Sequence, residues 1–130
     1  MILVDSSAWV EFLRATGSAA HLHLRSALEQ GDDLAGTDVI VMEILAGARD
    51  DAHRDWLRRL LYGLEFLAVD GPVDYEQAAE LYRLCRTHGE TPRKLDDCLI
   101  AAVAIRSGAE LLCQDTDFEV IARHAPLRLV

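Results

Sequence analysis

Short apolar runs alternate with longer segments of helical periodicity along most of the chain, and this alternation constrains the fold more than any other feature. Runs typical of buried strands predict strands at residues 2–4, 34–36, 65–69, 110–113 and 127–130. Helical patterns predict helices at residues 6–15, 18–30, 39–48, 50–62, 74–88, 92–107 and 117–124. Short strands joined by helices form a parallel sheet covered on both faces, so we expect an α/β fold.

The chain shows no repeat, linker or low-complexity tract that would divide it. Its 130 residues suffice for one compact domain, because a chain of this size buries roughly 70% of its unfolded surface. We therefore expect a single domain over residues 1–130.

Several acids follow the predicted strands at their carboxyl ends. Asp5 comes directly after the first strand, and Asp115 and Asp117 come just after the strand that ends at Cys113. In open parallel sheets, ligands bind beyond the carboxyl ends of the strands. If both strands belong to one sheet, these acids share an edge of it.

Two further acids lie inside apolar helical segments. Glu43 stands within VIVMEILAG, and Asp97 is followed at helical spacing by Ile100 and small residues. An unpaired buried charge costs several kcal/mol, and the sequence places cations only near Asp97, at Arg93 and Lys94. A divalent cation would compensate all of these acids at once, and Mg²⁺ or Mn²⁺ prefers such oxygen ligands.

Each acid also has a purely structural interpretation. Asp5 and Asp117 could cap the helices that follow them, with Ser6 or Ser7 as other caps for the first helix. Asp97 lies in an early helical turn, where the helix dipole favours acids. Glu43 has the weakest alternative of this kind, since acids in the middle of apolar helices are uncommon.

The charge balance argues against a general grip on nucleic acid. The formal net charge is −9, whereas proteins that bind phosphates usually carry basic patches. A nucleic-acid ligand would need bound cations or local arginines to reverse the sign at one site. Lys94 is the only lysine, and arginine can bind phosphate through two hydrogen bonds.

The cysteines indicate a reducing compartment. Cys85, Cys98 and Cys113 form no CxxC pair and lie in apolar stretches, as buried thiols do. No apolar run reaches the roughly 20 residues that span a bilayer, and no signal peptide is recognisable at the N-terminus. We therefore expect a cytoplasmic protein.

Four stretches together resemble the PIN domain, specifically VapC-type toxins of bacterial toxin–antitoxin pairs. They are MILVDSSAWVEFLR, VIVMEILAGA, TPRKLDDCLIAAVAIRSGA and QDTDFEVIA, and their order covers nearly the whole chain. The resemblance implies a FEN-nuclease-like, three-layer α/β/α sandwich around a short-stranded parallel sheet.

The resemblance also implies a site and an activity. The family's acids fall on Asp5, Glu43, Asp97 and Asp115, with Asp117 as an additional metal ligand and Ser6 as a hydroxyl that borders the site. The implied protein is an endoribonuclease that uses Mg²⁺, with Mn²⁺ as a substitute, and that cuts tRNA or rRNA and so inhibits translation. The implied products carry 5′-phosphate and 3′-hydroxyl ends.

The partners follow from the same resemblance. RNA would be held by arginines, with Arg93 and Arg49 as candidates, and a cognate VapB-type antitoxin would inhibit the toxin. The antitoxin tail is expected in a groove between the helix that carries Trp9 and Phe12 and the helix that carries Trp56. Aromatic residues at such helical spacing are, however, more often core than contact surface. Homodimers and larger toxin–antitoxin complexes are also implied.

Other functions remain to be weighed against this one. A receiver domain would need an acidic pair after the first strand and a lysine after a late strand, but Lys94 precedes a predicted helix. A phosphatase of the haloacid dehalogenase type would need Asp-x-Asp where this chain has Asp5-Ser6-Ser7. A non-catalytic metal-binding α/β interaction module is the alternative that the sequence leaves open.

Overall fold

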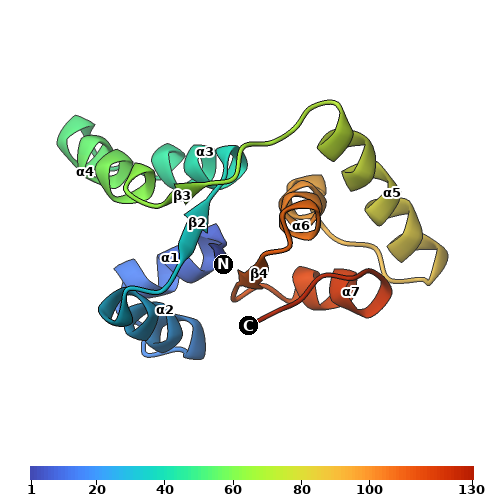
Figure 1. The fold of residues 1–130 in the computed structure, drawn as a ribbon, viewed down its shortest axis with the longest axis horizontal. Coiled ribbons are helices and arrows are strands. Elements are labelled where there is room, and N and C mark those ends of the chain that lie inside the picture. Colours follow the sequence, from blue (N-terminus) through green and yellow to red (C-terminus); the bar gives the residue numbers. More distant parts are fainter.

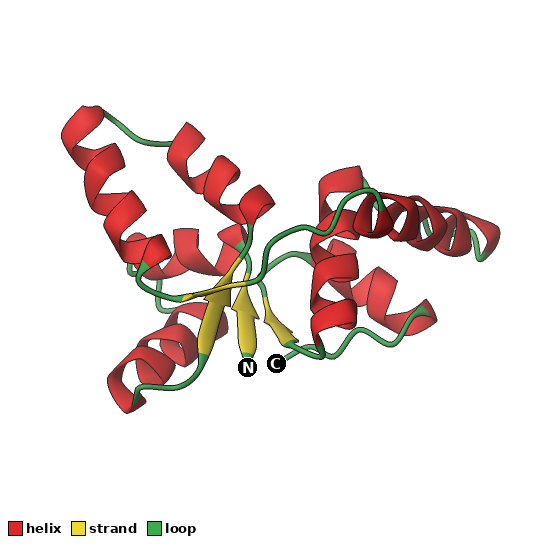
Figure 2. Cartoon of the chain, turned by 45° about the horizontal axis from the view of Figure 1, so that its top comes forward, coloured by secondary structure: helices red, strands yellow, loops and turns green.

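A four-stranded parallel sheet forms the centre of the protein, which is described over residues 1–130 by a computed structural model. The strands are β1 (Ile2–Val4), β2 (Leu34–Gly36), β3 (Glu65–Phe66) and β4 (Glu110–Leu112). Their order is β3-β2-β1-β4, and Figure 2 shows the central strands pointing the same way. The prediction of an α/β fold with a short-stranded parallel sheet is thereby confirmed.

Seven helices surround this sheet. They are α1 (Ser6–Leu13), α2 (Ala19–Gln30), α3 (Asp38–Ala46), α4 (Asp51–Tyr62), α5 (Val73–Thr87), α6 (Leu95–Ser107) and α7 (Thr116–His124). Helices α1 to α4 lie on one side of the sheet and α5 to α7 on the other, which gives the expected three layers (Figures 1 and 2).

The connections explain this division into layers. The chain steps from β1 to β2 to β3 in one direction and then returns past β1 to β4. Because parallel crossovers are right-handed, the forward steps and the return step place their helices on opposite faces. Strands β1 and β4 are neighbours, with Leu3 paired to Leu111, yet α1 and α7 leave them on opposite sides. Such a switch point is where open α/β sheets bind ligands.

The core is continuous through both layers. On one side Trp9 of α1 packs fully buried, and on the other Phe118 of α7 does the same. In α6 every residue from Asp97 to Ala104 is buried, as expected for a helix that is apolar nearly all round. This helix therefore brings Asp97 into the interior with the apolar residues that follow it.

Several predicted boundaries were wrong. The strand predicted at 65–69 keeps ladder pairing only over Glu65–Phe66, and the one predicted at 127–130 is a single bridge between Leu129 and Leu111. Helix α6 begins at Leu95 and not near Pro92, so residues 91–94 form a loop. From that loop Arg93 reaches Asp117, which follows β4, through its backbone N–H and its guanidinium.

One capping assignment and one core assignment were also wrong. Of the residues proposed as the cap of α1, Asp5 has this role and Ser6 and Ser7 do not, whereas α7 is capped by Asp115 in place of the predicted Asp117. Trp56 was expected in the core but is 47% exposed, because α4 buries Leu57 and Leu61 instead. None of the helices has the combination of length and apolar character that crossing a membrane requires.

Candidate active site

Asp5 occupies the end of β1 and points into the switch point of the sheet. Its backbone N–H donates to the carbonyl of Leu112 in β4 (2.9 Å), and its Oδ2 accepts the N–H of Ser7 (3.0 Å) as the cap of α1. The other oxygen, Oδ1, is buried without a hydrogen-bond partner. Asp5 thus has the capping role that the sequence suggested through Oδ2, while Oδ1 is left free for a ligand.

Ser7 joins the two loops that carry the acids. Its hydroxyl donates to Asp5 Oδ2 at 2.5 Å and accepts the backbone N–H of Gln114 at 2.9 Å. The loop after β1 is therefore tied to the loop after β4 through one side chain. Ser6, and not Ser7, was predicted to border the site, because two adjacent serines at a helix start give no signal that separates them.

Asp97 enters the same space from the first turn of α6. It is 3% exposed, and its Oδ2 has no hydrogen-bond partner. Burial is the main cause that raises the pKa of this carboxyl to about 7; the charges of Asp5 and Asp115 contribute to the rise, while Lys94 opposes it. A carboxylate in this position lacks a protein group that balances its charge.

Glu43 approaches from α3 on the other side of the sheet edge. It is half-buried, and its Oε1 accepts a hydrogen bond from the Ser6 hydroxyl at 3.2 Å. Burial raises the pKa of Glu43, and the charge of Asp5 adds to this. The chain contributes Ser6 to the site in the bordering position that the resemblance implied.

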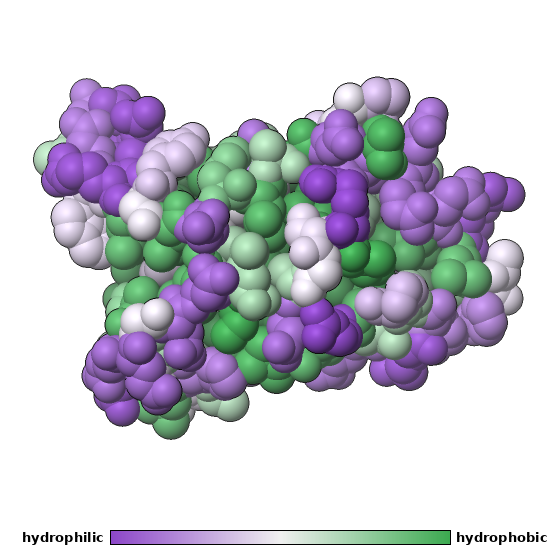
Figure 3. All heavy atoms as spheres, viewed as in Figure 1, coloured by the Kyte–Doolittle hydropathy of each residue, from purple (hydrophilic) through white to green (hydrophobic).

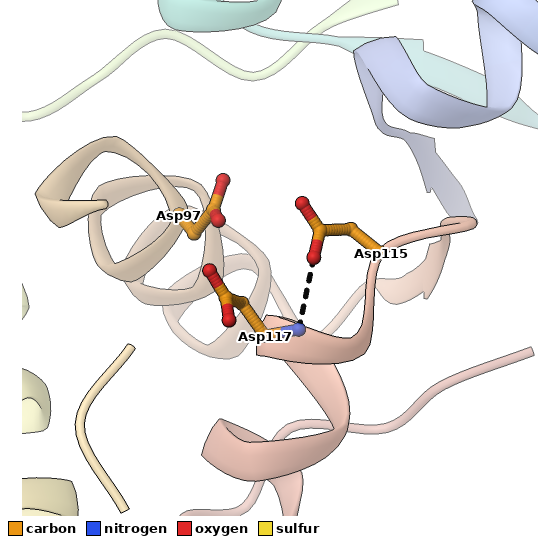
Figure 4. A group of neighbouring side chains, drawn as sticks. All are labelled: Asp97, Asp115 and Asp117. Atoms are coloured by element: carbon orange, nitrogen blue, oxygen red, sulfur yellow. Dashed lines mark hydrogen bonds between the residues drawn. The ribbon is translucent and has the colours of Figure 1, made fainter. Parts of the chain in front are cut away.

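Asp115 and Asp117 complete the cluster at the start of α7. Oxygen atoms of Asp97, Asp115 and Asp117 all lie within 4.8 Å of one another. Figure 4 shows the three carboxyl groups turned toward one another, with Asp117 N–H donating to Asp115 Oδ1 (3.0 Å). Arg93 bonds to both aspartates, through its backbone N–H and guanidinium to Asp117 and through Nη2 to Asp115.

A pocket of about 330 Å³ opens onto this cluster. Its wall includes five of the predicted site residues, namely Asp5, Ser6, Glu43, Asp97 and Asp115. The wall also includes residues that were not predicted for the site, namely Ser7, Val10, Glu11, Arg14, Thr16, Lys94 and Gln114. Only one residue of this wall is hydrophobic, so the pocket suits an ionic ligand.

The geometry fits a divalent cation. Two of the four buried side-chain atoms without a hydrogen-bond partner are Asp5 Oδ1 and Asp97 Oδ2, and both belong to this cluster. Buried polar atoms are nearly always satisfied, so two such oxygens at one place need a cause. Carboxylate oxygens are the ligands that Mg²⁺ and Mn²⁺ prefer, and both aspartates line the same pocket, so the donor set fits such a cation.

A larger groove continues from the pocket between α1, α3 and α4. It measures about 1010 Å³ and shares Ser6, Val10, Arg14 and Glu43 with the pocket. Its apolar residues include Leu13 and Trp56, which are 38% and 47% exposed. On the face shown in Figure 3, hydrophobic residues lie between the hydrophilic corners formed by α4 and α2.

The predicted arginines fall in different places. Arg93 contacts the acid cluster itself, whereas Arg49 lines the groove at a distance from it. The groove has the predicted helices as walls, α1 and α4, but not all of the predicted residues. Trp9 is buried in the core, and Val10 and Leu13 line the groove from α1 in its place.

Comparison with known proteins identifies the family. The sequence model described as PIN domain matches residues 2–124. The chain belongs to the PIN domain family. It is also similar to Ribonuclease VapC11 of Mycobacterium tuberculosis, with 52% identity over 124 residues that cover 95% of this chain and 92% of the relative.

Solved structures of VapBC proteins share the fold. The chain aligns with the structure of VapBC-1 from nontypeable Haemophilus influenzae at a TM-score of 0.77 and 15% identity, over 100% of this chain and 97% of that one. It aligns with VapBC2 from Rickettsia felis, bound to a DNA fragment from its promoter, at 0.75 and 18% identity, over 100% and 98%. This PIN-family chain therefore has the VapC fold over its full length.

Proposed function

We propose that this PIN-domain protein is the toxin of a VapBC-type pair, a Mg²⁺-dependent endoribonuclease whose catalytic residues are Asp5, Glu43, Asp97 and Asp115. The observation that carries the proposal is the pair of buried carboxylate oxygens, Asp5 Oδ1 and Asp97 Oδ2, left without protein partners at the switch point of the sheet. The 52% identity to a ribonuclease of the VapC group supports the choice of RNA as substrate.

Each residue has a distinct task in this proposal. Asp5, Asp97 and Asp115 would hold the ion, which when bound polarises the scissile phosphate and lowers the pKa of an attacking water. Ser7 fixes Asp5 through its hydroxyl, so that Oδ1 stays turned to the pocket. Glu43 lines the pocket opposite, where it can accept a hydrogen bond from the water.

The products define the reaction. Water attacks phosphorus in line and gives up one proton to solvent, the P–O3′ bond breaks with its electron pair on O3′, and the leaving 3′-oxygen takes one proton from solvent. One fragment then carries a 5′-phosphate and the other a 3′-hydroxyl. Lys94, whose side chain lines the pocket, places a positive charge beside the phosphate while this happens.

End-labelled RNA tests this proposal. The purified protein is incubated with a labelled RNA pool in Mg²⁺ and, in parallel, in EDTA, and the ends are identified by their requirement for kinase or phosphatase. We expect cleavage only in Mg²⁺, with 5′-phosphate ends. RNA that stays intact while Mg²⁺ binds would instead indicate a non-catalytic metal-binding module.

A folded cellular RNA, tRNA or rRNA, is the substrate we propose, with inhibition of translation as the result. The net charge of −9 disfavours a non-specific grip on long polyanions, so recognition would depend on shape and unpaired bases. Sequencing of 5′-phosphate ends from expressing cells would locate the cut. Scattered cuts in mRNA, with tRNA and rRNA intact, would reject this substrate. We place this activity in the cytoplasm.

The partner we propose is a VapB-type antitoxin with an amphipathic tail. The groove of about 1010 Å³ exposes Leu13 and Trp56 to such a helix and leads directly to Glu43. An arginine of the tail would bind two of the site carboxylates in place of metal. The net charge of −9 would attract a basic tail and speed its capture. Homodimers bridged into larger VapBC complexes are part of the same proposal.

Magnesium competition tests this mode of inhibition. We expect that raising Mg²⁺ weakens binding of the tail peptide more than it weakens binding of a peptide whose arginine is replaced by glutamine. Fluorescence anisotropy of the two labelled peptides gives both affinities. Equal responses to Mg²⁺ would show that the arginine stays outside the site and that inhibition works by blocking RNA access.

A further inference from the structure

Arg93 makes an unusually complete set of contacts for a side chain that is 68% exposed. Its backbone N–H donates to Asp117 Oδ2 at 3.1 Å, and its Nε lies 3.3 Å from each oxygen of that carboxylate. Its Nη2 donates to Asp115 Oδ1 at 3.0 Å. One arginine thus binds both acids of the last motif.

These contacts divide the acid cluster into two halves. Both oxygens of Asp117 accept hydrogen bonds from Arg93, and Asp115 Oδ1 accepts from Arg93 and from Asp117 N–H. On the other side, Asp5 Oδ1 and Asp97 Oδ2 have no partner. The half that faces β1 is therefore open to a cation, and the half that faces α7 already holds one, the guanidinium.

The short distances between the acids bear on how many metal ions the cluster can bind. Oxygen atoms of Asp97, Asp115 and Asp117 lie within 4.8 Å of one another, so the α7 half could hold an ion of its own. Nucleases with two ions keep them about 3.5–4 Å apart and share carboxylates between them. A guanidinium bound to Asp115 and Asp117 occupies the place that a second ion would need.

We propose that Arg93 is a built-in replacement for a second metal ion, so that this chain binds a single divalent cation, at Asp5, Asp97 and Asp115. The inference rests on the proposed metal-dependent function and states which residues bind the ion and how many ions are bound. Asp117 then acts as the anchor of Arg93 and not as a metal ligand. The fixed charge of Arg93 at Asp115 and Asp117 would then supply positive charge there without a second cation.

Counting of bound Mn²⁺ tests this proposal without reference to activity. Electron paramagnetic resonance distinguishes free from bound Mn²⁺, and a pair of ions that share a carboxylate gives a coupled spectrum. We expect one uncoupled Mn²⁺ per wild-type chain. In Arg93→Gln we expect a second ion, with a dissociation constant within about tenfold of the first, and a coupled signal.

Three further variants keep the test specific. Arg93→Lys retains a positive charge and should keep the count at one. Arg93→Gln combined with Asp117→Asn should also return to one, because the second ion loses its carboxylate. Arg83→Gln, which changes an exposed arginine paired with Glu80 on α5, should behave as wild type.

The outcomes separate the inference from the function on which it rests. Two ions in the wild type, or one ion in folded Arg93→Gln at saturating Mn²⁺, would overturn the role of Arg93 and leave a metal-dependent enzyme in place. No bound Mn²⁺ in the wild type would overturn both. Circular dichroism of each variant establishes that it is folded, which the exposure of Arg93 leads us to expect.

Discussion

Two buried aspartates of this protein have similar exposure and opposite electrostatics. Asp74, at the start of α5, is 1% exposed, and its carboxylate accepts hydrogen bonds from Arg106 Nε (2.8 Å) and Nη2 (2.9 Å). Asp97, at the start of α6, is 3% exposed and has one oxygen without any partner. The hydrogen bonds from Arg106 lower the pKa of Asp74, whereas burial raises that of Asp97 to about 7.

This difference separates an acid whose charge is balanced inside the protein from one whose charge is not. Arg106 also donates to the carbonyl of Ala68, so the pair with Asp74 ties α6 to the chain that enters α5. The charges of Asp74 and Arg106 balance each other within the protein, and the pair contributes to stability. Asp97 has no such balance, and its unsatisfied oxygen is a cost that a ligand can remove. Burial alone would not have separated them.

Removal of the Asp97 carboxylate should have the largest effect on activity. We expect Asp97→Asn to lower the rate of RNA cleavage about a thousandfold, beyond the 10–100-fold typical of residues that only support a metal ligand. Asp96→Asn is the matched control, because Asp96 is the neighbouring acid and is exposed. Single-turnover cleavage rates in Mg²⁺ measure both. Equal rates in the two variants would remove Asp97 from the site.

Disruption of the Arg106–Asp74 pair should lower stability without lowering the rate of RNA cleavage. Arg106→Met leaves Asp74 buried without its cation, which should lower the free energy of unfolding by about 3 kcal/mol. Urea denaturation measures this change, and cleavage by the folded fraction should stay near the wild-type rate. The exposed pair of Arg83 and Glu80 offers the control, since Arg83→Met should cost at most about 1 kcal/mol. If Arg106→Met leaves the free energy of unfolding unchanged, the contacts between Arg106 and Asp74 make no net contribution to stability.

Metal-free stability should depend on pH in a way that identifies Asp97. Its folded pKa, about 7, exceeds the unfolded value of about 3.9, so the folded state retains a proton that the unfolded state has released. This contribution is fully present below about pH 4 and is lost as the pH rises through 7. In EDTA at pH 8, Asp97→Asn should therefore be more stable than wild type by on the order of 2 kcal/mol.

Thermal melts at several pH values check this expectation. The difference between Asp97→Asn and wild type should shrink as the pH falls from 8 to 5, and saturating Mg²⁺ at pH 8 should reverse its sign. Asp74 has the opposite dependence, since its pKa is lowered and its contribution is lost only as the pH falls below about 4. A difference that does not vary with pH would show that Asp97 is already paired in solution.

The acids at the site, such as Asp97, could be predicted from the sequence better than the ion pair of Asp74 and Arg106. Asp5 and Asp115 could be placed together because strand ends of a parallel sheet share an edge. Asp97 and Glu43 could be recognised because apolar neighbours make an acid conspicuous. The fold class followed from the alternation of strands and helices, and the PIN family from the motifs.

The ion pair between Asp74 and Arg106 could not be predicted in the same way. Asp74 and Arg106 lie 32 residues apart, and nothing in the sequence around either residue indicates the other. The same holds for Arg93, whose contacts with Asp115 and Asp117 depend on a loop where the sequence predicted the start of a helix. Capping was ambiguous for a local reason, because adjacent polar residues such as Asp5, Ser6 and Ser7 can all cap a helix. Pairs between residues far apart in the sequence, and the choice of one cap among adjacent polar residues, depend on how the whole chain packs.

The smallest expected effect concerns the two acids that Arg93 contacts. Asp115 lines the pocket and Asp117 does not, although Asp117 is the more buried of the two. If Asp115 is a ligand and Asp117 an anchor, Asp115→Asn should slow cleavage about a hundredfold and Asp117→Asn about tenfold.

Asparagine at position 115 can still cap α7, so the loss there reports on the charge and not on the helix. Melting temperatures should therefore change little in Asp115→Asn, whereas Asp117→Asn releases Arg93 and should raise the Mg²⁺ concentration needed for half-maximal rate. The reverse ranking of rates in matched assays would assign the ligand to Asp117 and leave Asp115 as the cap alone.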